Sequence, residues 1–98
     1  ALIFMVRALG RELARHHVRI NAVAITLTRD TPGYDWYASQ ADTDNVLVRA
    51  FKKLEREVPF GLNSPEDVVN AVSFLASDAS AQISGMTMSV NGGASFPG

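Results

Sequence analysis

The segment from Val18 to Ile25 is the part of the sequence that most constrains the fold. It reads Val-Arg-Ile-Asn-Ala-Val-Ala-Ile, so it is short, rich in β-branched residues and apolar at nearly every position. Such a run is typical of a parallel β-strand that is covered on both faces. Arg19 and Asn21 interrupt the run, so we expect burial mainly in its second half. A strand of this kind requires other elements on both sides of the sheet.

Three helices are predicted around this strand. Apolar residues at helical spacing predict a first helix that ends near His16 and a second helix over about 43–57. Ser64 is the expected N-cap of a third helix, with Pro65 at its first helical position. Residues 26–40 contain a Pro-Gly pair and three aromatic residues, and we interpret this segment as a long loop.

A second strand is predicted over 86–90, where Met86, Met88 and Val90 alternate with polar residues. Two strands joined through helices predict a parallel α/β arrangement with a right-handed crossover. Two strands alone would leave both edges of the sheet open. The first helix also begins without an N-capping residue and is apolar on every side of its first turn. We therefore expect the chain to be part of a longer polypeptide.

Composition excludes several classes of protein. The 98 residues carry 9 basic and 10 acidic side chains, and a formal charge of −1 argues against a nucleic-acid or membrane-surface partner. The absence of cysteine excludes a disulfide framework and a thiolate metal site, and it fits a reducing, cytoplasmic compartment. The longest apolar run, residues 1–6, is too short to span a bilayer. A hydrophobic content of 47% predicts a packed, soluble protein.

Four segments together resemble one protein family. In chain order they are RALGRELA at 7–14, VRINAVA at 18–24, SPEDVVNAVSFLASD at 64–78 and ISGMTMSVNGG at 83–93. In this order and at this spacing they are similar to the C-terminal part of a short-chain dehydrogenase/reductase. The resemblance implies that residues 1–98 are the C-terminal segment of a single Rossmann-type domain. This segment would supply two parallel strands and three helices to a doubly wound parallel sheet.

The resemblance also implies an oxidoreductase that transfers a hydride between NAD or NADP and a small-molecule alcohol or ketone. In the family a Tyr acts as acid and base, a Lys steadies the cofactor ribose, and a Ser holds the carbonyl oxygen. By the resemblance the Tyr-x-x-x-Lys motif would come immediately before Ala1. We therefore assign no catalytic residue to the chain and expect the 98 residues alone to be inactive.

The residues that follow the first strand are the nicotinamide site that the resemblance implies. In the family, Pro-Gly and the next few residues contact the carboxamide through backbone groups and a Thr hydroxyl. Here the corresponding residues are Ile25, Thr26, Leu27, Thr28 and Thr31. Ile25 and Thr26 stand where Pro-Gly is usual, which changes the backbone angles allowed at the strand exit. We expect Thr28 to offer backbone groups and Thr31 its hydroxyl.

Three aromatic residues, Tyr34, Trp36 and Tyr37, fall in the segment that covers the active site and sets substrate specificity in the family. One interpretation is that they form the apolar wall of a substrate pocket and exclude water from it. An equal alternative is that they hold the loop to the core or form a subunit contact.

Two further clusters are given other interpretations. Arg49, Lys52, Lys53 and Arg56 share one helical face and could receive a cofactor phosphate or an anionic substrate, but a solvated face is the favoured interpretation. The adjacent residues His16 and His17 point about 100° apart on a helix, so we expect no metal site there.

A different class of function is a non-catalytic assembly segment or a catalytically inactive relative. Members of the family form homodimers or homotetramers, and an apolar first turn suits a subunit interface. Assembly and catalysis are compatible in one polypeptide, so both hypotheses are kept.

Overall fold

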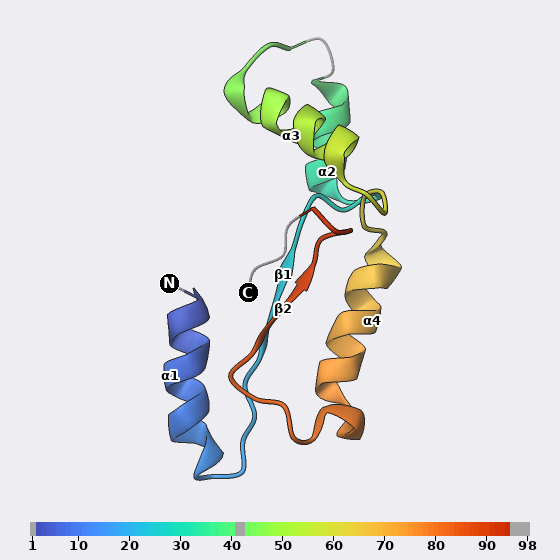
Figure 1. Cartoon of the computed structure of the whole chain (residues 1–98). Helices are drawn as coiled ribbons and strands as arrows, with labels where there is room; N and C mark the ends of the chain where they lie inside the picture. The colour runs from blue at the N-terminus through green and yellow to red at the C-terminus, as the bar shows by residue number, and fades with distance from the viewer. Residues whose placement is uncertain (1, 41–42, 95–98) are drawn as a thin grey trace. The chain divides into compact units, whose positions relative to one another are not determined.

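The structure is a computed structural model that describes residues 2–40 and 43–94. The elements run α1 (Leu2–Ala14), β1 (Ala22–Ile25), α2 (Pro32–Ser39), α3 (Val46–Glu57), α4 (Pro65–Ala76), a short 3-10 helix (Asp78–Ser80) and β2 (Thr87–Val90) (Figure 1). This order confirms the predicted α/β class. None of the described helices combines the length and the apolar character that crossing a membrane requires.

The two strands pair directly and run in parallel, as predicted (Figure 1). The Ala22 N–H donates to the Met86 carbonyl at 2.9 Å, and the Thr26 N–H donates to the Val90 carbonyl at 3.4 Å. Donor and acceptor advance in the same direction along the chain, which is the register of a parallel pair. The long connection from β1 to β2 contains helices, as a parallel crossover requires.

The predicted number of helices was wrong, because the described residues form four α-helices rather than three. The additional helix, α2, lies in the segment that was interpreted as a loop. Thr31 is its N-cap, with an extended backbone and a hydroxyl oxygen that accepts from the Tyr34 N–H at 3.2 Å. Pro32 occupies the first helical position, where the missing N–H costs nothing. The Pro-Gly pair that suggested a turn therefore begins a helix.

The first strand is shorter than predicted, and its burial differs. β1 begins at Ala22, whereas the apolar run begins at Val18. Ala24 is exposed and Ile25 has 52% of its surface exposed, so the expectation of burial in the second half was wrong. The described residues do not cover this end of the strand.

The side chains of Arg19 and Asn21, which precede β1, bond to the segment that precedes β2. Arg19 Nη1 donates to Ser80 Oγ at 3.0 Å and to the Ile83 carbonyl at 3.3 Å. Asn21 Nδ2 donates to the Ile83 carbonyl at 3.1 Å, and its Oδ1 accepts from the Met86 N–H at 3.1 Å. The two polar interruptions of the run are therefore ties between distant segments.

The predicted starts of the later helices are close to the observed ones. Asn45 caps α3, and its Oδ1 accepts from the Val48 N–H at 2.9 Å. Ser64 caps α4 as predicted: its hydroxyl accepts from the Asp67 N–H at 3.3 Å. The Asp67 carboxylate accepts in return from the Ser64 N–H at 2.8 Å, which completes a reciprocal capping pair. These hydrogen bonds to Ser64 hold the pKa of the Asp67 carboxyl below its usual value.

The chain divides into two compact units. Among the described residues, the first unit comprises 2–24 and 69–89, and the second comprises 25–40, 43–68 and 90–94. In the first unit α1 lies close to the turn before β2, since a Cβ placed on Gly10 would be 3.0 Å from the Gly85 Cα. In the second unit the buried apolar side chains are Tyr37, Val48, Val58 and Leu62.

Candidate functional site

The exit of β1 forms a loop that is held by its own threonine side chains. Thr28 is buried, and its hydroxyl donates to the Thr26 carbonyl at 3.0 Å. The Thr31 hydroxyl donates in turn to the Thr28 carbonyl at 2.7 Å. Of the predicted cofactor-binding residues, Thr26, Leu27, Thr28 and Thr31 lie on this loop, and Ile25 is the last residue of β1.

Asn63 joins this loop to other parts of the second unit. Its side chain is 4% exposed, and its Nδ2 donates to the Val90 carbonyl at 2.6 Å and to Thr26 Oγ1 at 3.5 Å. Its own carbonyl accepts from the Arg29 N–H at 2.8 Å, and it pairs with Thr28 in an isolated parallel bridge. No pattern in the sequence singles out Asn63. One polar residue just before a helix cap carries no periodic signal, so only the folded arrangement identifies it.

Thr26 and Thr31 retain hydrogen-bonding capacity that a nicotinamide carboxamide needs. A hydroxyl offers one proton and two lone pairs. At Thr31 the two bonds of the structure use the proton and one lone pair, so the second lone pair can accept an N–H. At Thr26 the bond from Asn63 uses a lone pair, so the hydroxyl proton can be donated. A carboxamide presents one N–H₂ donor and one carbonyl acceptor, which match these two groups.

Of the three predicted substrate residues on α2, Tyr34 and Tyr37 contact each other, whereas Trp36 is exposed. Tyr37 is buried against α3, where its ring meets Phe51 edge-on at a centroid distance of 5.5 Å. Tyr34 is half-buried and contacts the Tyr37 ring edge-on at 5.9 Å. Trp36 has 43% of its surface exposed. Of the three rings, Trp36 is therefore the most open to a ligand.

A hydrogen bond between Tyr37 and Glu55 links α2 to α3. The Tyr37 hydroxyl donates to Glu55 Oε2 at 2.7 Å. This bond, the burial of the ring and the negative charge of Glu55 together raise the pKa of Tyr37 to about 12. The phenol therefore stays protonated at neutral pH and acts as a structural donor.

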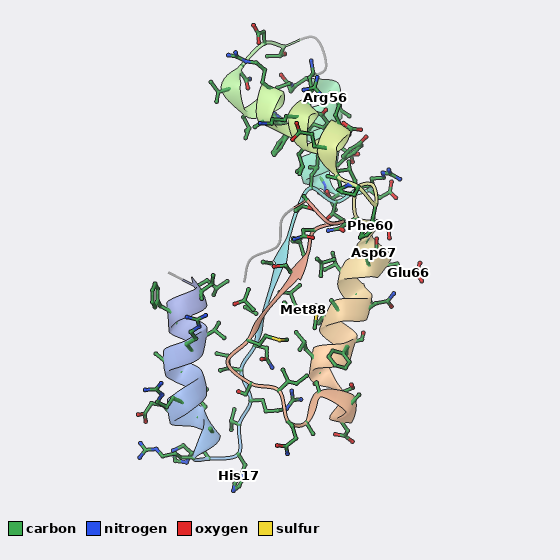
Figure 2. The ribbon with its side chains drawn as sticks, viewed as in Figure 1. His17, Arg56, Phe60, Glu66, Asp67 and Met88 are labelled. Atoms are coloured by element: carbon green, nitrogen blue, oxygen red, sulfur yellow. The ribbon has the colours of Figure 1, made fainter. Side chains whose placement is uncertain are left out.

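The remaining candidates from the sequence lie at the surface. Arg49 Nε forms an exposed ion pair with Asp44 Oδ1 at 3.1 Å, and Lys53 and Arg56 on the same helix are exposed. His17 follows α1 with a positive φ of 59° and is exposed (Figure 2). Within 2–40 and 43–94, no group of three or more His, Asp or Glu is placed to hold a metal ion.

A shallow hollow lies beside the Asn63 tie, at the entrance to α4. Its lining includes Phe60, Asn63, Asp67 and Val90. Figure 2 labels Phe60 and Asp67, which come from the turn before α4 and from its first turn. Phe60 has 85% of its surface exposed, whereas Asn63 and Asp67 contribute polar groups to the same hollow.

A parallel strand pair with helical connections is the arrangement of α/β folds built on a parallel sheet. A family model described as enoyl-(acyl carrier protein) reductase matches residues 1–95. The chain therefore belongs to this family of short-chain dehydrogenases/reductases, as its sequence motifs predict, and the Rossmann-type fold class is confirmed.

Individual relatives agree with this assignment. The chain is 38% identical over 93 residues to the 3-oxoacyl-(acyl-carrier-protein) reductase FabG of Rickettsia felis, covering 94% of this chain and 34% of that protein. It is 34% identical over 93 residues to the human (3R)-3-hydroxyacyl-CoA dehydrogenase, covering 94% and 32%. The chain spans about a third of the length of these curated relatives.

Solved structures show the same fold. The 3-ketoacyl-(acyl-carrier-protein) reductase of Brucella melitensis, in complex with NADH, superimposes with a TM-score of 0.72 at 28% identity, covering 97% of this chain and 34% of that one. A short chain dehydrogenase family protein of Francisella tularensis gives a TM-score of 0.77 at 27% identity, covering 95% and 39%.

Proposed function

We propose that residues 1–98 are the C-terminal segment of an NAD- or NADP-dependent oxidoreductase that interconverts a ketone and an alcohol. The proposed substrates are 3-oxoacyl and 3-hydroxyacyl thioesters, because the names of the relatives from Rickettsia felis and human specify this chemistry. The observation that carries the proposal is the family match over residues 1–95. The acid–base Tyr and its Lys would be supplied by the polypeptide upstream of Ala1.

The proposed contribution of this chain to the cofactor site is Ile25 at the end of β1 and the loop from Thr26 to Thr31. When bound, the nicotinamide supplies or accepts the hydride. The chain's own residues hold the carboxamide: the Thr31 hydroxyl accepts an N–H, the Thr26 hydroxyl donates to the carbonyl oxygen, and Leu27 and Thr28 contribute backbone groups. The hydrogen bonds from Thr28 and Thr31 keep this loop in one conformation before the cofactor binds, which reduces the entropic cost of binding.

The proposed contribution to the substrate site is Trp36, supported by the tie between α2 and α3. The bond from Tyr37 to Glu55 and the packing of Tyr37 on Phe51 fix the helix. The exposed Trp36 ring then offers an apolar wall to the acyl chain. In this proposal Tyr37 supports the position of Trp36 by fixing α2, and Tyr34 packs against Tyr37.

The test of the proposed function is nicotinamide-dependent turnover of a 3-oxoacyl thioester. A longer polypeptide that contains residues 1–98 should oxidise NADH or NADPH in the presence of acetoacetyl-coenzyme A, and the 98-residue chain alone should not. Replacement Trp36→Ala should raise the KM for long-chain 3-oxoacyl thioesters about tenfold and change the KM for acetoacetyl-coenzyme A less, because the lost apolar contact grows with the acyl chain.

Two results would contradict this function. The absence of nicotinamide oxidation by the longer polypeptide with any 3-oxoacyl thioester would favour a catalytically inactive relative. Turnover by the 98-residue chain alone would contradict the placement of the catalytic residues upstream.

A second proposed role is assembly, and the exposed first turn of α1 favours it. Leu2 and Ile3 each have 48% of their surface exposed, Met5 has 51% and Phe4 has 75%. A contiguous apolar surface of this kind is usual at a protein interface and rare at a surface in contact with water. We propose that this face contributes to a homodimer or homotetramer of the full-length enzyme, a role that is compatible with catalysis.

A further inference from the structure

The loop after β1 reads Thr-Leu-Thr-Arg-Asp-Thr over 26–31 and contains neither proline nor glycine. Proline would fix φ, and glycine would allow tight turns that other residues reach only with strain. Asp30 adopts a positive φ of 57° in this loop, so the path includes a conformation that side-chain-bearing residues seldom adopt. Hydrogen bonds must therefore set the path of the loop.

Asn63 supplies the hydrogen bonds that connect this loop to the end of β2. Its buried amide group donates one hydrogen to the Val90 carbonyl and the other to Thr26 Oγ1. Its main-chain carbonyl accepts from the Arg29 N–H. Thr26 and Arg29 of the loop and Val90 of β2 are thus all bonded to Asn63, which lies far from the loop in the sequence.

An amide is the chemical group that this position requires. Asparagine offers two N–H donors on one nitrogen, whereas an ionised aspartate of the same shape offers only acceptors. The Val90 carbonyl and the Thr26 hydroxyl oxygen both accept in this arrangement. Because Thr26 Oγ1 accepts from Asn63, the proton of that hydroxyl remains to be donated elsewhere.

We propose that Asn63 is a positioning residue for the cofactor. It holds Thr26 against the end of β2 and leaves the Thr26 hydroxyl proton directed to the carbonyl oxygen of the nicotinamide carboxamide. This inference rests on the proposed function, because it assigns Asn63 a role in that same cofactor site. Asn63 acts through Thr26 and the Arg29 backbone and makes no contact of its own with the reacting atoms.

The test compares Asn63→Asp with Asn70→Asp in the full-length enzyme. Asn70 is exposed on α4, so Asn70→Asp makes the same change of charge at a position without buried contacts. Asn63→Asp should raise the KM for NADH or NADPH about tenfold or more and lower kcat less, since both hydrogen bonds donated by the buried amide are lost. Hydrogen exchange at the Arg29 amide should also quicken about tenfold, and Asn70→Asp should change neither quantity.

A double-mutant cycle separates positioning from a general loss of structure. Thr26→Val alone should raise the KM for the nicotinamide cofactor and leave the exchange of the Arg29 amide unchanged. Added to Asn63→Asp, it should raise the KM by less than twofold, because the two residues act through one hydrogen bond. A simple multiplication of the two single effects would overturn the proposal.

The remaining outcomes are also decisive. Faster exchange at Arg29 with an unchanged cofactor KM would make Asn63 a structural residue only. If Asn63→Asp does not fold, an unchanged KM in Thr26→Val overturns the proposal by itself. If the unaltered enzyme binds neither NADH nor NADPH, the proposed function is wrong. If the unaltered enzyme binds the cofactor and the Asn63 and Thr26 variants bind it equally well, only the inference about Asn63 is wrong.

Discussion

The two units of the chain differ in how they bury their apolar residues. The second unit contains Tyr37, Val48, Val58 and Leu62, each 7% exposed or less. In the described part of the first unit, Val6 is the apolar side chain that reaches comparable burial. The first unit exposes a larger set instead: Leu2, Ile3, Phe4, Met5, Leu9, Val18, Val69, Val72 and Phe74.

This difference shows that the second unit has a small core of its own, whereas the first depends more on polar ties. In the first unit Arg19 and Asn21 bond to the segment before β2. Such ties contribute less free energy than a filled apolar core, because each replaces a bond to water. The second unit also exposes Phe60 and Val46, so the contrast concerns the presence of a core and not the absence of exposed apolar groups.

The largest expected loss of stability comes from Gly92→Ala in the second unit, and it tests whether this unit has a core of its own. Gly92 has a φ of 58°, and a Cβ on it would overlap Val58 Cγ1 and lie 2.5 Å from the Gly61 carbonyl oxygen. Strain from the positive φ and the forced repacking together predict a loss of about 3 kcal/mol in the free energy of unfolding. Urea unfolding gives the total change, and peptide-resolved hydrogen exchange over 58–62 and 90–94 shows where it occurs.

Gly33→Ala is the matched control, because the nearest described atom is 4.0 Å from its added Cβ. Since Gly33 lies in the first turn of α2, we expect this change to be neutral or stabilising by about 0.5 kcal/mol. Equal loss of exchange protection in both units after Gly92→Ala would remove the distinction between them.

The next largest effect is expected from Arg19→Ala in the first unit. It removes the charged donors to Ser80 and Ile83, so we predict a loss of about 2 kcal/mol and faster hydrogen exchange across 77–83. The control Arg15→Ala breaks an exposed pair with Glu12 and should cost less than about 0.5 kcal/mol. Equal effects of the two replacements would show that the polar tie does not hold the first unit together.

A smaller effect is expected from Tyr37→Phe, which keeps the ring in the core of the second unit and removes its hydrogen bond to Glu55. We predict a loss of about 1 kcal/mol, measured by urea unfolding at neutral pH. The control Tyr34→Phe should leave the stability unchanged within about 0.3 kcal/mol. A loss of equal size in both variants would show that the hydrogen bond of the Tyr37 hydroxyl does not stabilise the contact between α2 and α3.

The same variant also predicts a pH dependence. The pKa of Tyr37 is raised to about 12 in the folded chain, above the ordinary tyrosine value of 10.0. The unfolded state therefore loses this proton first as pH rises, so the stabilisation is complete below pH 10 and is lost towards pH 12. The difference in stability between the native chain and Tyr37→Phe should shrink over that interval. A difference that is constant with pH would contradict the raised pKa.

Regular helices could be predicted from the sequence because their signals are local. Helical spacing predicted α1 and α3, and the Ser64-Pro65 pair predicted the start of α4. α2 was missed because Pro32-Gly33 is common both in turns and at the first positions of a helix. The deciding feature is the hydroxyl of Thr31, which caps the helix and also bonds to Thr28.

The sequence by itself determined the family, the parallel α/β class and the segment that carries the candidate cofactor loop. These follow from local patterns and from motifs in a particular order along the chain. Only the tertiary structure decided that Asn63 holds the loop, that Arg19 joins the segment before β2, and that Tyr37 is buried while Trp36 is open. Each of these depends on residues that are distant in the sequence and meet only in the folded chain, so no local pattern encodes it.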